Sequence, residues 1–438
     1  MIRIRNLVAA TAAMAVTAIF TLSAYHSQNV ELEFAMFGGN NWDVAVQDSY
    51  VVYDEAIAEF EKLHPNVKVN YVKGIMKEDY SEWLSEKILM DKAPDVMMIQ
   101  NKDFDKFAQL NIIEKLDNWM ETDTSFDSSK IYSTALEAGI TDNTQYALPI
   151  ETVPYIMFVN KTLLATEGIE IPKADYTLKD LYDICKKVTK DTDGDGIVDQ
   201  FGIFKYSWQD AAAANGAVMF SSNGKKCNFT SEELKKAVAY MITLNELNGS
   251  QAVTQENFDA GKVAFMPLTL AEYRTYKTYP YKIKKYSNFQ WDCIPMPQGE
   301  NGKNTSRVDS LDVAMSSRSE HKALAWEFMK FLTTSEEVQR KIFEDTSAAS
   351  VLKSVMEDDS AETIFTEDMA DADRTLHSQM ISSVIENGQA EPQFSAYEGA
   401  MQLADSEISE LIKSDSQSDL ESELRRIQQK VTEYISVF

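Results

Sequence analysis

From Val30 to Asn101 the apolar and polar positions alternate between strand-like and helix-like stretches. The apolar run "VELEFAMFGG" ends in a glycine turn and predicts a buried strand. In "YDEAIAEFEKLHP" apolar residues recur on one helical face, and Pro65 ends the predicted helix. The next stretches predict a strand, a second helix and a third strand: "VKVNYV", "DYSEWLSEKILMD" and "PDVMMIQN". Strands that are apolar on both faces favour a mainly parallel sheet covered by helices, which is an α/β fold.

The alternation of predicted strands and helices continues to the end of the chain. "YALPIETVPYIMFVN" (residues 146–160) is a long extended run that Pro149 and Pro154 interrupt. "TLKDLYDICKKVTK" predicts a helix with Thr177 as its N-cap. Three further strands, two amphipathic helices and a helical tail follow: "FGIF", "GKVAFMPLTL", "FQWDCIPMPQG", "HKALAWEFMKFLTTSEEVQRKIF" and the residues from 393. Since no low-complexity linker separates these elements, we expect two lobes between which the chain crosses more than once.

The N-terminus has the pattern of an export signal. Arg3 and Arg5 precede an uncharged, apolar stretch at residues 7–24. That stretch is long for a cleaved signal and short for a membrane span, so cleavage and retention as an anchor at residues 1–28 both stay open. No cysteine follows it that could carry a lipid. Either way, we expect the rest of the chain to work outside the cell membrane.

Charge and motif content narrow the function. The chain has 42 basic and 69 acidic residues, and a net charge of −27 repels phosphate backbones, which argues against nucleic acid as a partner. The four histidines are scattered, and no nucleophile elbow, P-loop or dinucleotide fingerprint occurs. A glycosidase pair among the many carboxylates stays open, but no pair stands out. The three cysteines are too far apart in sequence to suggest a zinc site or a disulfide framework.

The stretch "DTDGDGIVDQFG" (residues 191–202) has the spacing of a calcium-binding loop. Calcium prefers several oxygen ligands from one short loop with a glycine at its sharp turn. The expected ligands are four side chains and one backbone carbonyl: Asp191, Asp193, Asp195 and Asp199, and the carbonyl of Ile197. Position 12, where the motif requires glutamate, is Gly202. A structural Ca²⁺ ion is the favoured interpretation, because clustered carboxylates repel one another without a cation; a solvated acidic turn is the alternative.

Aromatic residues beside polar ones at predicted strand ends suggest a sugar site. Sugars present apolar C–H faces and a rim of hydroxyl groups, and α/β proteins bind ligands beyond the carboxyl ends of their strands. The candidate ligand-binding residues are Asn41, Trp42, Asp43, Gln100, Asn101, Glu151, Tyr155, Trp208, Tyr273, Arg274, Asp309 and Ser310. We expect roughly half of them to lie near one cleft and the others to be ordinary surface or core residues.

The order of these landmarks resembles the family-1, carbohydrate-binding type of extracellular solute-binding proteins of ABC transporters, which includes maltose-binding proteins. The resemblance is carried by "AIAEFEKLHPNVKVNYV", "APDVMMIQ", "YALPIETVPYIMFVNKTLL", "YTLKDLYDICKKVTKDTDGDGIVDQFGIF", "GKVAFM" and "EHKALAWEFMKFLTTSEEVQRKIF". It implies one α/β lobe from residues 29–150 and 269–331, and a second from 151–268 and 332–438. It also implies a ligand cleft between the lobes, hinge closure, and a calcium loop on the second lobe away from the cleft.

Two features depart from that family. The anchoring cysteine of lipoprotein relatives is missing, and "MPLTLAEYR" lacks the tryptophan that many relatives have there, with Tyr273 as the candidate replacement. The favoured hypothesis is a monomeric, membrane-associated binding protein that captures a sugar or oligosaccharide and delivers it to an ABC permease. A ligand that bridges both lobes favours the closed state, and no bond is broken. The alternatives are a secreted calcium-containing carbohydrate-active enzyme and a ligand-sensing subunit of a membrane receptor.

Overall fold

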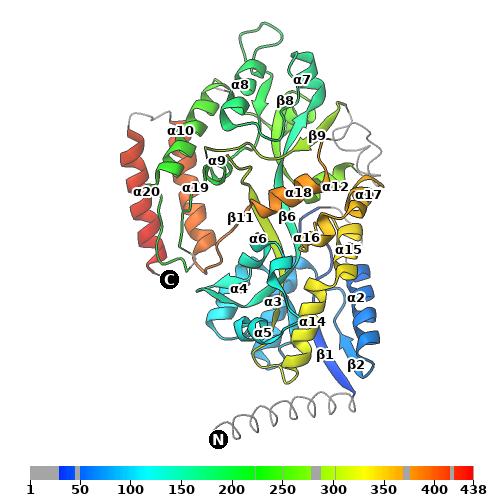
Figure 1. Ribbon diagram of the computed structural model, residues 1–438. Helices are drawn as coiled ribbons and strands as arrows, with labels where there is room; N and C mark the ends of the chain where they lie inside the picture. The colour runs from blue at the N-terminus through cyan, green and yellow to red at the C-terminus, as the bar shows by residue number, and fades with distance from the viewer. Residues whose placement is uncertain are drawn as a thin grey trace, which may run out of the picture.

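The computed structural model describes eight segments of the chain: residues 29–44, 50–221, 223–249, 251–277, 288–300, 302–367, 375–414 and 419–437. The predicted export signal at residues 1–28 lies outside them. The described segments form two α/β lobes, as expected (Figure 1).

Strand β6 (Ala147–Asn160) runs through both lobes and connects them. Its first part pairs antiparallel with β10 (Arg307–Met315), and its second part pairs with β8 (Val263–Thr269) and β9 (Trp291–Ile294). All of its residues except Tyr155 are buried, and it forms the long extended run that the sequence predicts. The pairing with β10 shifts register between Leu311 and Asp312, beside the segment of β6 that contains Pro149. Proline has no N–H for the ladder and is tolerated where pairing is irregular.

The remaining strands of the sheet fall on either side of β6. In the first lobe, β1 (Val30–Ala35) pairs parallel with β2 (Val67–Asn70) and β3 (Val96–Ile99), and β10 pairs antiparallel with β3. In the second lobe, β7 (Phe201–Ile203) pairs parallel with β8. The two-residue β11 (Gln389–Ala390) pairs parallel with β10. The sheet is therefore mixed rather than mainly parallel, because β6 runs antiparallel to each of its neighbours.

Helices cover the sheet in both lobes (Figure 1). In the first lobe and beside its junction with the second are α2 (Tyr50–Leu63), α3 (Lys77–Leu89), α4 (Asn101–Gln109), α5 (Asp117–Thr122), α6 (Ser133–Glu137), α12 (Leu270–Lys277), α14 (Lys322–Thr334), α15 (Glu336–Asp345), α16 (Lys353–Met356), α17 (Asp359–Glu367) and α18 (Ser378–Glu386). In the second lobe are α7 (Lys161–Thr166), α8 (Leu178–Val188), α9 (Trp208–Asn215), α10 (Glu232–Glu246), α11 (Gln255–Asp259), α19 (Tyr397–Lys413) and α20 (Leu420–Ile435). A 3₁₀ turn (Ser128–Lys130) and the small hairpin β4 (Ile140–Thr141) and β5 (Thr144–Gln145) complete the first lobe.

The lobe boundaries predicted from the sequence differ from the observed packing in two places. The sequence places strand β9 in the first lobe, but β9 pairs with the second part of β6, whereas β10 pairs with the first part. Buried residues from 338 to 385 pack in the core cluster that contains β1, β3 and β10, whereas those from 394 to 435 pack with α8 and α10. The last crossing therefore lies near β11 and not after residue 334.

Local sequence sets several of these elements as predicted. The hydroxyl of Thr177 accepts a hydrogen bond from the backbone N–H of Asp180, and the two residues form a capping box at the start of α8. Strand β7 then lies directly against that helix, because Gly202 has no side chain: a Cβ atom there would meet the Cβ of Cys185 at 2.4 Å. All three cysteines are free thiols, as their spacing indicates.

We predict that Gly202→Ala lowers the free energy of unfolding by about 1–3 kcal/mol, because the added methyl group forces β7 away from α8. Urea denaturation followed by circular dichroism measures this change. The variant Ser129→Ala, at an exposed turn, is the control and should unfold at nearly the wild-type midpoint. An unchanged midpoint for Gly202→Ala would show that the strand and helix can separate without cost.

Candidate ligand-binding site

A cavity of about 700 Å³ lies where the two lobes meet. This volume is within the range of roughly 300–1,000 Å³ that is typical of small-molecule sites. The first lobe contributes the loop after β1 and the start of α4, and the second lobe contributes α9 and α19. Strands β10 and β11 and residue Tyr155 of β6 lie between these walls. A molecule in the cavity would therefore touch both lobes at once.

Most of the predicted ligand-binding residues line this cavity. They come from the loop after β1, the end of β3, and strands β6 and β10: Asn41, Trp42, Asp43, Gln100, Asn101, Tyr155, Asp309 and Ser310. Their sequence signal was the change from apolar to polar or aromatic residues at strand ends. The structure brings them together because β1, β3, β10 and β6 are successive neighbours in the sheet.

Glu151 lies behind the cavity wall and supports it. One carboxylate oxygen accepts a hydrogen bond from Trp42 Nε1 at 2.7 Å, and the other accepts one from the Tyr53 hydroxyl at 2.8 Å. Burial raises the pKa of Glu151, and the two hydrogen bonds oppose that shift. The carboxylate thus fixes the direction of the Trp42 indole ring, which is half-buried at the cavity.

Three predicted residues do not face the cavity, and here the sequence interpretation is corrected. Trp208, at the first turn of α9, is only 2% exposed, and its Nε1 donates to Asp405 of α19 at 2.9 Å. Tyr273 is fully buried in α12 and donates to Asp292 of β9 at 3.0 Å. The Arg274 guanidinium donates to backbone carbonyls of the 343–348 region at 2.6 Å each. All three side chains join buried elements, so Tyr273 does not replace the missing tryptophan platform.

The sequence interpretation also missed part of the site. Residues 389–395, which cross between the lobes, line the cavity, as do Tyr397 and Glu398 at the start of α19. A two-residue strand such as β11 has no periodicity that could predict it. Arg307, two residues before Asp309, carried a usable signal, because it begins a strand whose alternate side chains share one face.

Arg307 is the electrostatic centre of the cavity. Its Nη2 lies 3.3 Å from Asp210 Oδ1 in α9, and its Nη1 lies 3.8 Å from Glu391 Oε1. Its guanidinium carbon lies 4.2 Å from the centre of the Tyr155 ring, in cation–π contact. Ser207 and Asp210 form a capping box at the start of α9, which positions the Asp210 carboxylate next to Arg307. Arg307 therefore joins β10, β6 and α9.

Two further carboxyl groups beside Arg307 carry shifted pKa values. Burial, together with the charge of Glu391, raises the pKa of Asp309 to about 7. Burial also raises the pKa of Glu391. The opposing effect of Arg307 is smaller than that of burial in both cases. At neutral pH this part of the cavity is thus close to a change of charge.

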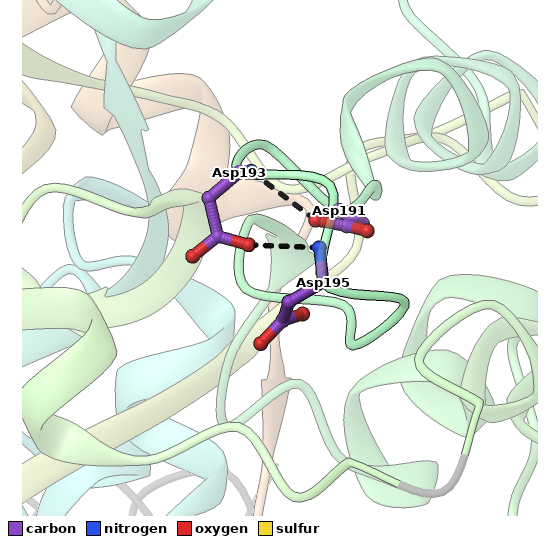
Figure 2. Close-up of side chains that lie close together, drawn as sticks. All are labelled: Asp191, Asp193 and Asp195. Atoms are coloured by element: carbon purple, nitrogen blue, oxygen red, sulfur yellow. Dashed lines mark hydrogen bonds between the residues drawn. The ribbon is translucent and has the colours of Figure 1, made fainter.

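The aspartate loop lies elsewhere in the second lobe, between α8 and β7 (Figure 2). One carboxylate oxygen each of Asp191, Asp193 and Asp195 can be chosen so that all lie within 4.8 Å of one another. The Asp191 carboxylate accepts hydrogen bonds from the N–H groups of Gly194 and Gly196, each at 2.7 Å, and these bonds lower its pKa. Three carboxylates on one curled loop fit the oxygen ligands that Ca²⁺ prefers.

Two expectations for this loop need correction or refinement. Asp199 does not join the three other carboxylates: it accepts hydrogen bonds from Thr192, and its Oδ2 lies 2.6 Å from Lys262 Nζ. The ammonium group of Lys262 already neutralises its charge. Gly202 cannot be replaced by the glutamate of the usual motif, because its position against Cys185 leaves no space for a side chain. Ile197 lies on the same loop, and its backbone N–H donates to Asp195 Oδ1 at 2.8 Å.

Among the described residues, no helix has the length and apolar character needed to cross a membrane.

Comparison with known proteins identifies relatives. A sequence model of bacterial extracellular solute-binding proteins matches residues 45–339. Among solved structures, a cyclic alpha-maltosyl-1,6-maltose binding protein from Arthrobacter globiformis matches with a TM-score of 0.75 and 16% identity, covering 93% of this chain and 100% of that one. The sugar-binding protein MalE from Xanthomonas citri has a TM-score of 0.73 and 17% identity, with 93% and 98% covered. An ABC substrate-binding protein from Listeria monocytogenes, solved with cycloalternan, has a TM-score of 0.66 and 19% identity, with 93% and 99% covered.

We predict that Asp309→Asn stabilises the protein at pH 8 by about 2 kcal/mol and has little effect at pH 4. Between pH 4 and 7 the Asp309 carboxyl keeps its proton in the folded chain but loses it in the unfolded chain. The folded state therefore binds more protons, and stability falls as the pH rises through this window. Because asparagine cannot ionise, the variant does not undergo this loss of stability as the pH rises.

Urea denaturation at pH 4, 6 and 8 measures the difference between variant and wild type. Asp175→Asn, at an exposed position in the second lobe, is the control and should give the same small difference at each pH. A stability gain for Asp309→Asn that does not change with pH would contradict the assignment.

Proposed function

Because the chain belongs to the family of bacterial extracellular solute-binding proteins, we propose that it captures a sugar or oligosaccharide in the cavity between its lobes and delivers it to the permease of an ABC importer. One observation carries this proposal: the 700 Å³ cavity combines the Trp42 indole with a rim of amide, hydroxyl and carboxylate groups. An indole ring packs against the C–H face of a sugar, and the rim can bind its hydroxyl groups.

The similar solved structures support the choice of ligand class. The proteins from Arthrobacter globiformis and Xanthomonas citri are named for binding cyclic maltosyl-maltose and sugar, and the Listeria monocytogenes protein was solved with cycloalternan. Each matches this chain over nearly its whole length. Their low sequence identity leaves the cavity residues free to differ, so the particular sugar must come from the residues of this cavity.

The mechanism is differential affinity for two arrangements of the lobes. A ligand that touches Trp42 and Gln100 on the first lobe and Tyr397 on the second makes its full set of contacts only when the lobes are closed. It shifts the equilibrium toward closure by the contacts that the open state lacks. The permease then recognises the closed surface. No bond of the ligand is broken in this scheme.

Location and assembly follow from the same proposal. The protein is exported by the signal at residues 1–28, which either is cleaved or stays as an anchor at the outer face of the cell membrane. It works as a monomer, because one chain supplies both walls of the cavity. A Ca²⁺ ion held by Asp191, Asp193, Asp195 and the carbonyl of Ile197 would stabilise the loop between α8 and β7 without touching the ligand.

We predict that Trp42→Ala weakens binding of the sugar ligand by about 10- to 100-fold, since it removes the aromatic surface under the sugar ring. Isothermal titration calorimetry with the best ligand from a panel of mono- and oligosaccharides measures the loss. Trp83→Ala is the matched control, because Trp83 of α3 is half-buried like Trp42 but lies outside the cavity. It should bind with wild-type affinity.

The same panel tests the proposed function itself. Sugars should raise the melting temperature of the wild-type protein, because a ligand that binds only the folded state stabilises it by mass action. If amino acids or polyamines raise it while no saccharide does, the carbohydrate assignment is wrong.

We predict that 1 mM CaCl₂ raises the melting temperature of chelator-treated protein by roughly 3–5 °C, because Ca²⁺ binds the folded loop and relieves repulsion between its carboxylates. Asp193→Asn should abolish this response. In the presence of chelator, the variant should melt no lower than the wild type, since it carries one fewer mutually repelling charge.

Asp175→Asn, an exposed acid outside the loop, is the control and should keep the full calcium response. Differential scanning fluorimetry gives the melting temperatures of the three proteins, each with calcium and with chelator, in one experiment. An equal calcium shift in the wild type and Asp193→Asn would refute a specific ion on this loop.

A further inference from the structure

Two acidic side chains project from neighbouring strands into the cavity. Strands β10 and β11 pair parallel with Arg307 opposite Gln389 and Val308 opposite Ala390. The next position of this register places Asp309 beside Glu391. Side chains at matching positions of parallel strands lie on the same face of the sheet, and both residues line the cavity. Like charges directly opposite one another in a sheet are unfavourable, so ionisation of both groups needs a compensating cation.

Arg307 and Lys77, two of the cations that line the cavity, do not provide full compensation. Lys102 of α4 also lines the cavity, but it is exposed and is not among the charges that shift the pKa of Asp309. Arg307 lies nearest to the pair, but its Nη2 is also 3.3 Å from Asp210 Oδ1. One guanidinium group therefore interacts with the carboxylates of Asp210, Asp309 and Glu391. Lys77 lies 2.9 Å from Asp43 and also donates to the carbonyl of Asn41.

The carboxylates of Asp309 and Glu391 also lack hydrogen-bond donors among the described residues. Within the described part of the chain, no N–H or O–H group donates a hydrogen bond to the carboxylate of Asp309 or Glu391. Asp105, another acid of the cavity wall, differs: its carboxylate accepts bonds from Thr141, Gln109 and Ser395. Gln209 Oε1, in the cavity wall formed by α9, is also buried and has no hydrogen-bond partner. The cavity therefore offers several strong acceptors without donors.

This pattern favours one kind of ligand group over others. A sugar hydroxyl can donate one hydrogen bond, but it leaves the charge of the two carboxylates in place. A sugar carboxylate would add a further negative charge in a partly buried site, where repulsion is stronger than in water. A protonated amino group supplies three N–H donors and a positive charge in one atom, and so satisfies both needs.

Resting on the proposed function, we propose that the cavity selects a saccharide with a protonated amino group, which binds between the carboxylates of Asp309 and Glu391. The aromatic side chains of Trp42 and Tyr397 contact the body of the sugar, and the acidic pair recognises the amine. The selectivity lies in the charge of one substituent and not in the size of the sugar. It narrows the ligand from the saccharides named for the three similar structures to one with a particular substituent.

The test compares three series of β-1,4-linked glucose units, each with one to four units. The series differ only at carbon 2 of each ring, which carries an amino, an acetamido or a hydroxyl group. Isothermal titration calorimetry at pH 7 measures each affinity. The amino series should bind at least tenfold tighter than both others. Acidification from pH 7 to 5.5 should weaken its binding severalfold, because protons neutralise the carboxylates and compete with the amine.

Variants then assign the effect to the pair. Asp309→Asn and Glu391→Gln should each reduce the ratio of amino to hydroxyl affinity toward one. Asp175→Asn, which removes an exposed carboxylate outside the cavity, is the control and should keep the ratio. Loss of folding is excluded by an unchanged affinity for the hydroxyl series, or by unchanged circular dichroism if that series does not bind.

The possible failures are distinguishable. Equal affinity for the amino and hydroxyl series, or a ratio that the two variants do not change, overturns the amino-sugar inference and leaves the proposed function intact. If the protein binds other neutral oligosaccharides but no member of the amino series, the amino-sugar inference is again wrong and the proposed function stands. If no saccharide of any kind binds while another class of solute does, both proposals fall.

Discussion

The pairing of β6 with strands of both lobes is the constraint on which the rest of the structure depends. The first part of the strand pairs with β10 and the second part with β8 and β9, so the two lobes share one continuous backbone ladder. The strand also supports the cavity directly. Glu151 and Tyr155 are four residues apart and point to the same face: one binds the indole of Trp42, and the other lies under the guanidinium of Arg307. Movement of the lobes about this strand would change the shape of the cavity but would keep the contacts that Glu151 and Tyr155 of β6 make.

Charge has opposite roles in the two acidic regions of the molecule. On the aspartate loop, backbone N–H groups donate hydrogen bonds to the Asp191 carboxylate and lower its pKa. In the cavity, burial opposes ionisation of Asp309 and Glu391, and one arginine is shared among three acids. We propose the first region as a calcium site that stabilises its loop. The second is poised to respond to a charged ligand, because a small change in its surroundings changes its protonation.

Much of the fold was predictable because it follows from local rules. Periodicity gave the positions of α2, α3, β3 and α14, and the Thr177 cap marked the start of α8. Roughly the expected share of the strand-end residues proved to line one cavity. The failures have physical causes. Trp208 and Tyr273 are residue types that often contact ligands, but their polar atoms donate hydrogen bonds to Asp405 and Asp292 of the protein itself. A sequence pattern does not distinguish a polar aromatic side chain that binds a ligand from one that binds an acidic residue of the same chain.

The sequence by itself determined the features that depend only on residues close together along the chain. The α/β pattern, the spacing of Asp191, Asp193 and Asp195, and the glycine at position 202 are all local features. Only the tertiary structure decided which lobe the segment from 338 to 385 joins, and that β11 returns to lie beside β10. That return places Glu391 next to Asp309 and creates the acidic pair. The physical reason is that strand pairing between distant segments is set by packing of the whole sheet, and a two-residue strand carries too little pattern to reveal its partner.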